Sequence, residues 1–158
     1  MIGTLIRGAL AGAAATWVMD RATTLLYDVQ APEVTRQEEA AQPNGKSSVS
    51  NMVDRFEAQT GVVVPPQRRP LVENVVHYAL GAVPGALYAL ARKVPGVRAL
   101  NGAGYGLALF AANDEFLNTK LGFAGAARAY PPETHFRGLA GHVVLGTATE
   151  TGIQLLGG

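Results

Sequence analysis

The chain has 158 residues, a length that suits one domain. Hydrophobic residues make up 48% of it and charged residues only 16%, which is too apolar for an ordinary soluble domain, and a net charge of +1 gives no basic surface for nucleic acid. The absence of cysteine excludes disulfide bonds and thiolate metal sites. A mean hydropathy of only +0.14 indicates that polar segments interrupt the apolar ones.

The first apolar segment covers residues 3–27. Arg7, followed by a short apolar run with small residues, would also fit a signal peptide. However, the helical pattern continues past Asp20 through "RATTLLY". The sequence therefore predicts a retained first membrane span.

A polar connector, residues 28–70, follows and holds no apolar run of spanning length. Within it, "SSVSNMVDRFEAQTG" has the spacing of a short amphipathic helix, with Ser48 as its N-cap and Gly61 as its end. Its apolar face consists of Val49, Met52, Val53 and Phe56. We expect this helix to lie on the membrane surface or to cover the other helices, and contact with a partner protein is the alternative.

Three further apolar segments cover residues 71–92, 98–117 and 136–156, each about the ~20 residues that cross a bilayer. Glycines recur in the spans at four-residue spacing, which lets helices approach closely in lipid. These pairs are Gly8/Gly12, Gly81/Gly85 and Gly102/Gly106. In a soluble helix each glycine would cost ~1 kcal/mol relative to alanine, so a soluble bundle of buried helices is the less favoured alternative.

Short connections after the second and third spans predict antiparallel neighbours. The expected fold is therefore all-α: an integral membrane four-helix up-down bundle that forms a single domain, 1–158, with a polar loop containing the short amphipathic helix. The Lys and Arg residues of the loops favour a cytoplasmic position for 28–70 and 118–135, although Arg92, Lys93 and Arg98 oppose it.

Up-down topology brings ionisable residues from different spans to one depth. His77 and His142 each lie six residues into their spans, roughly 9 Å deep at the helical rise per residue. Asp20 lies at about the same depth on the same side. Glu73 shares a helical face with His77 and is favoured by its position in the first turn of the second span.

The third span ends in two adjacent carboxylates, Asp114 and Glu115. Glu115 continues the polar stripe that starts at Asn101 and Tyr105, so Glu115 is predicted to face inward. A carboxylate near a helix C-terminus is opposed by the helix dipole and needs a cation, a proton or a partner. The predicted partners are His77, His142 and Arg137.

Ionisable residues at membrane depth are usually paired and often functional. Three interpretations of the ionisable residues at this depth therefore stay open. The first is a structural network that fixes helix register. The second is a site for a metal ion or haem, although "ENVVH" lacks the Glu-x-x-His spacing of di-iron bundles. Its candidate metal ligands are His77, His142, Glu115, Glu73 and Asp20. The third is a proton or small-solute conduit that also uses Glu150.

The sequence contains none of the common hydrolase, nucleotide-binding or metalloprotease signatures. The expected role is therefore non-enzymatic: a small membrane module or accessory subunit. Its expected partners are the lipid bilayer and a protein of a membrane complex or a second copy of the chain. The metal- or haem-binding protein and the conduit are the alternatives.

Three motifs resemble the YagU-like family of bacterial inner-membrane proteins, a domain of unknown function. These are "VVHYALGAVPGALYAL", "GAGYGLALFAANDEFLNTKLGF" and "HFRGLAGHVVLGTATE", which together span roughly residues 71–157. The resemblance implies a multi-pass protein of the bacterial inner (cytoplasmic) membrane and supplies no reaction. The positions it carries over are His77, Gly81, Glu115 and His142.

Overall fold

The computed structural model describes all residues, 1–158, and its secondary structure is entirely helical, which confirms the all-α prediction. Three of the predicted spans correspond closely to the helices α1 (Ile2–Asp28), α4 (Arg69–Ala91) and α7 (Pro132–Leu155). Pro70 and Pro132 lie in the first turns of α4 and α7, where the missing N–H group of proline has no helical partner to lose.

The third predicted span, 98–117, begins later and ends later than expected. Leu100 and Asn101 have φ values of 54° and 51°, so a 3-10 turn, η2 (Ala99–Gly102), precedes the helix. The helix then runs through α5 (Ala103–Leu109), a π-helical segment η3 (Phe110–Leu117) and α6 (Asn118–Lys120). A π-helix is rare and occurs mostly at functional sites.

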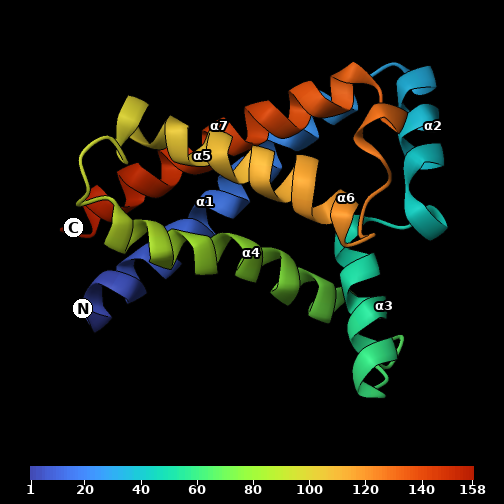
Figure 1. Ribbon diagram of the computed structural model, residues 1–158, viewed down its shortest axis with the longest axis horizontal. Coiled ribbons are helices and arrows are strands. Elements are labelled where there is room, and N and C mark those ends of the chain that lie inside the picture. Colours follow the sequence, from blue (N-terminus) through green and yellow to red (C-terminus); the bar gives the residue numbers. More distant parts are fainter.

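These four helical stretches form what we call the helical body, in which successive members run in opposite directions (Figure 1). The helix α1 lies between α4 and α7, and α5 packs on the other side of α7. Both chain termini and the α4–α5 connection lie at one end, which we call the terminal end. The helices α2, α3 and α6 lie at the opposite end, which we call the connector end.

Glycines line the helix contacts, as the four-residue spacing predicted. A Cβ atom built on Gly85 would lie 2.6 Å from the carbonyl oxygen of Gly8 and 2.9 Å from the Cα atom of Gly12. On the other side, Gly106 lies against the backbone of His142, and Gly146 lies against that of Gly102. The α1–α4 and α5–α7 contacts are therefore backbone-to-backbone at these points.

Large apolar side chains point outward instead of filling the interior. Only 23 of the 158 residues are buried, and one core cluster consists of Ala11, Tyr88, Ala89 and Ile153. The exposed large side chains of the helical body include Leu10, Trp17, Leu25, Val75, Val83, Leu87, Phe116 and Phe136. The packing thus places small residues inside and large apolar residues outside.

By length and composition, α1 is the one helix able to cross a membrane on its own. A signal sequence or the core helix of a soluble protein can have the same length and composition. Only 28% of its apolar window is buried, which is unlike the core helix of a soluble protein. The structure by itself therefore supports one membrane-capable helix.

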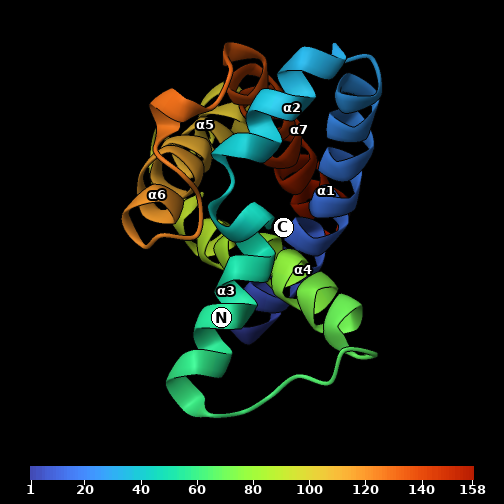
Figure 2. The same ribbon diagram turned by 90° about the vertical axis from the view of Figure 1, so that its right-hand side faces the viewer.

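The connector contains two helices, α2 (Pro32–Ala41) and α3 (Ser48–Thr60), where the sequence predicted one. The N-cap of α3 is Ser47, whose hydroxyl accepts a hydrogen bond from the Ser50 N–H group, and not the predicted Ser48. Gly61 ends α3 in the left-handed conformation, as predicted. Figure 2 shows α3 extending away from the helical body.

Candidate functional site

Asp20 and His77, which the sequence placed at one level of their helices, form a pair at the connector end. The Nε2–H group of His77 on α4 donates to Oδ1 of Asp20 on α1 at 2.8 Å. Both side chains are about one third exposed. The pair therefore joins two antiparallel helices.

The partners predicted for Glu115 are wrong, because its neighbour Asp114 is the carboxylate that lies beside His142. Oδ2 of Asp114 lies 3.6 Å from Nδ1 of the buried His142, and the Asn113 amide donates to Oδ1 of Asp114 at 2.9 Å. The cause is the π-helical segment, because each π turn holds an extra residue and rotates the following side chains by about 100°.

Glu115 instead pairs with His135 near the start of α7. The two ring nitrogens of His135 donate to Glu115 Oε1 at 2.6 Å and to the Ala127 carbonyl oxygen at 3.0 Å. Partial burial alone would lower the pKa of His135, but these two hydrogen bonds outweigh it and raise that pKa above 6.5. In its protonated form, His135 therefore binds both Glu115 and the loop before α7.

Glu73 belongs to a separate ionic group that ties α3 to α4. Arg69 donates to Glu73 at 3.0 Å, to Glu57 at 3.0 Å and to Asp54. Lys46 also donates to Asp54, and these hydrogen bonds hold the pKa of Asp54 below its usual 3.8. This group is structural, because every carboxylate in it has a cationic partner.

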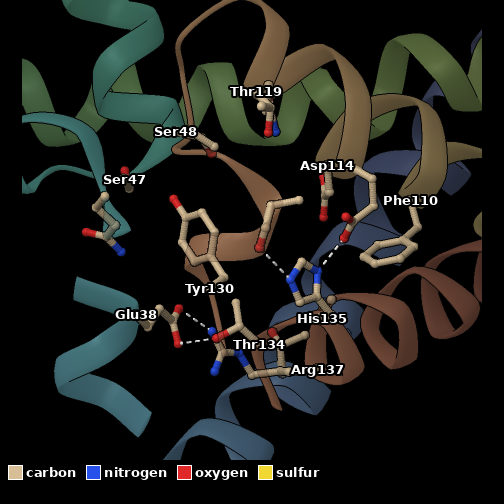
Figure 3. A pocket seen from close by; sticks show the side chains of 17 residues that line it. Glu38, Ser47, Ser48, Phe110, Asp114, Thr119, Tyr130, Thr134, His135 and Arg137 are labelled. Carbon is tan, nitrogen blue, oxygen red and sulfur yellow. Dashed lines mark hydrogen bonds and ion pairs between the residues drawn. The ribbon is translucent and has the colours of Figure 1, made fainter. Parts of the chain in front are cut away.

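Glu38 and Arg137 form a largely buried ion pair that the sequence did not predict. Glu38 on α2 is 9% exposed and pairs with Arg137 on α7, and the Thr134 hydroxyl donates to Glu38 at 3.0 Å (Figure 3). The sequence "RQEEAA" does not indicate which of its two glutamates faces the helical body. The pair fastens α2 onto the helical body.

Two adjoining cavities lie among these pairs. The outer cavity, about 320 Å³, lies between α2, the chain around α6 and the start of α7, and His135 and Glu115 line it (Figure 3). The inner cavity, about 350 Å³, lies inside the helical body and is lined by His77 and His142. Ser48, Asp114 and Asn118 line both cavities.

At the terminal end, Glu150 on α7 is completely buried. Its carboxylate accepts hydrogen bonds from Arg92 Nε at 2.9 Å, Arg98 Nε at 2.8 Å, the Tyr88 hydroxyl at 2.8 Å and the Gln154 amide at 2.7 Å. A buried carboxylate with two arginines and two further donors is fully paired. The structure thus places Glu150 with Gln154 in an ion-pair network at the terminal end, further along α7 than His142.

The five predicted metal-ligating residues are divided among four places. Asp20 and His77 form one pair, His142 faces Asp114, Glu115 faces His135, and Glu73 faces Arg69. No group of three or more His, Asp and Glu side chains lies close enough together to hold a metal ion. What the arrangement provides is a set of separate pairs, three of which join a histidine to a carboxylate of another helical segment.

Comparison with known proteins adds no relative: no family model, no curated protein and no solved structure matches the chain.

Proposed function

We propose that this protein is a non-enzymatic, multi-pass integral membrane module whose four long helical stretches all lie in the bilayer. The observation that carries the proposal is the packing of the helical body, with glycine at the contacts and large apolar side chains outside. Water would penalise that arrangement, whereas lipid gives no hydrophobic drive between helices and favours close contact of small residues.

The positions of the charges support the same proposal. Along α1, the stretch from Gly8 to Met19 carries no Asp, Glu, His, Lys or Arg, and neither does α4 from Tyr78 to Ala91. The paired charges gather instead toward the connector end and, around Glu150, toward the terminal end. In α1 and α4, polar ends thus flank an uncharged stretch, which is the arrangement that a bilayer favours.

The histidine–carboxylate pairs have a structural role in this proposal. Asp20–His77 joins α1 to α4, and Glu115–His135 joins η3 to α7. Each pair holds two antiparallel helices at one register in a medium that offers no competing water. As a module of this kind, the protein would serve as an accessory subunit or associate with a second copy. The resemblance to the YagU-like family would place it in the bacterial inner membrane.

Site-directed labelling tests the proposal. The chain has no cysteine, so a single introduced cysteine is its sole thiol. We expect Val83→Cys, on the outer face of α4, to resist a membrane-impermeant maleimide in native vesicles and to react once the protein is denatured. Val29→Cys, in the turn between α1 and α2, is the control and reacts from one side of the membrane. Equal labelling of Val83→Cys and Val29→Cys in vesicles would refute membrane insertion of α4.

A further inference from the structure

The geometry of the inner cavity points to a binding site for a small organic cation: a protonated amine with a compact apolar body. This goes beyond the structural role proposed above, because it assigns a ligand to the space between the helices. The cavity volume, about 350 Å³, falls within the range of small-molecule sites, which starts near ~300 Å³. It is far larger than a bare metal ion requires.

An unpaired polar side chain faces this cavity. Asn118 is only 7% exposed and lines both cavities, yet its side-chain amide makes no hydrogen bond within the protein, whereas its backbone carbonyl accepts from Phe123 and Ala124. The amide atoms of Asn118 stay accessible, because the Tyr105 hydroxyl is the one buried side-chain polar atom without a hydrogen-bond partner. The free amide of Asn118 is therefore a group that a bound ligand would satisfy.

Three polar groups at the cavity can accept hydrogen bonds from a ligand. Nδ1 of His142 donates to the Gly138 carbonyl oxygen at 3.0 Å, which leaves Nε2 as an acceptor. Asp114 supplies a carboxylate, and Pro84 cannot donate to the Leu80 carbonyl one turn earlier. A ligand that matches these acceptors must bring several N–H donors.

Charge selects the same class of ligand. Asp114 is the only carboxylate among the lining residues, and none of them is Lys or Arg. The histidine nearest to Asp114 is His142, at 3.6 Å, and the other lining histidine, His77, already donates to Asp20. An ammonium group would provide the missing positive charge and its donors together.

The rest of the lining is apolar and irregular. Met19, Leu109, Leu117 and Leu145 contribute walls from three different helical stretches, which suits a compact hydrocarbon body. The third stretch is irregular at the level of the cavity, where it contains its π-helical segment, and α4 carries Pro84 there within a continuous helix. π-Helical segments occur mostly at functional sites. The shared residues Asp114 and Asn118 connect the cavity to the polar outer cavity, which provides an entry path.

Isothermal titration of the full chain in mild detergent tests the site, with benzylamine as the probe and benzyl alcohol as its uncharged counterpart. We expect saturable binding of benzylamine and at least about tenfold weaker binding of benzyl alcohol, since a charge-assisted hydrogen bond contributes about 1.5–3 kcal/mol. Asp114→Asn and Asn118→Leu should each weaken benzylamine binding by about tenfold. Glu115→Gln, which removes the adjacent carboxylate outside the inner cavity, should bind like the wild type.

Three results would overturn the site: no saturable benzylamine binding, equal binding of the alcohol and the amine, or equal benzylamine affinity in Asp114→Asn and the wild type. The comparison of the two probes on the wild-type chain decides the question even if Asp114→Asn fails to fold. Vesicle labelling of Val83→Cys is an independent measurement, so loss of the ligand site and loss of the membrane proposal are distinguishable.

Discussion

Gly85 and Gly12 lie in backbone contact across the α1–α4 interface, where a Cβ atom on Gly85 would lie 2.9 Å from the Cα atom of Gly12. Close approach of two helix backbones at this point requires that neither residue has a side chain. Because α1 also packs on α7, a change of spacing here would be passed to both neighbours of α1.

Replacement of Gly85 by alanine should therefore destabilise the protein. The added methyl group would overlap Gly8 and Gly12, and overpacking of this kind costs about 1–3 kcal/mol or more. Thermal unfolding in mild detergent, followed by circular dichroism, measures the effect. Gly3→Ala is the matched control, since nothing lies within 4 Å of its Cβ position and alanine favours helix. A Gly85→Ala protein as stable as Gly3→Ala would contradict the contact.

Glu150→Gln should destabilise the protein strongly. It leaves Arg92, whose side chain is 9% exposed, without its ionic partner, and removal of one member of a buried ion pair costs about 3–5 kcal/mol. The midpoint of thermal unfolding should fall, and Glu133→Gln, at an exposed position of the same helix, should change stability by no more than about 0.5 kcal/mol. Similar stabilities of the two variants would show that the Glu150 network is not formed.

The His135–Glu115 pair makes the loop before α7 sensitive to pH. The pKa of His135 is raised above 6.5 in the folded state, so its contribution to stability is complete below pH 6.5 and is lost as the pH rises through the raised pKa. Titration of the histidine ring protons by NMR measures this pKa. In Glu115→Gln the charged acceptor is gone and the pKa of His135 should fall. An unchanged pKa in that variant would assign the shift to another group.

Arg69 should control how firmly α3 is held. Arg69→Ala removes the hydrogen bonds to Asp54, Glu57 and Glu73, so local opening of α3 should become more frequent. Cleavage by chymotrypsin after the exposed Phe56 should accelerate by about tenfold or more, which corresponds to ~1.4 kcal/mol. Arg68→Ala changes the neighbouring exposed arginine and should leave the cleavage rate unchanged. Equal rates for both variants would show that Arg69 does not hold α3.

The helices and their glycine contacts could be predicted because they follow from local and repetitive signals. Apolar segments of spanning length, bounded by Pro70 and Pro132, located the starts of α4 and α7 to within a few residues. Asp20 and His77 could be placed at one level because α1 and α4 are regular and antiparallel, although position alone did not decide which side chains pair.

The parts that could not be predicted depend on departures from regular geometry. Asp114 faces inward because of a π-helical segment, and "FAANDEFL" contains no proline or glycine that would mark it. Leu100 and Asn101 adopt left-handed conformations, which could not be predicted from these two residue types. The Glu38–Arg137 pair joins residues 99 positions apart, and a charge pattern does not specify partners at that separation.

The separation in sequence between Glu150 and its arginines has a consequence for biogenesis. Arg92 is made 58 residues before Glu150, so the arginine has no partner until α7 has been synthesised. The α1–α4 contact needs only residues already synthesised, whereas neutralisation of Arg92 and Arg98 must await the last helix. The order of synthesis thus makes α7 the last helix that the fold needs. An assembly intermediate that lacks α7 would expose Arg92 and Arg98 without their carboxylate partner. Quality-control machinery could distinguish it from the finished protein by these two unpaired charges.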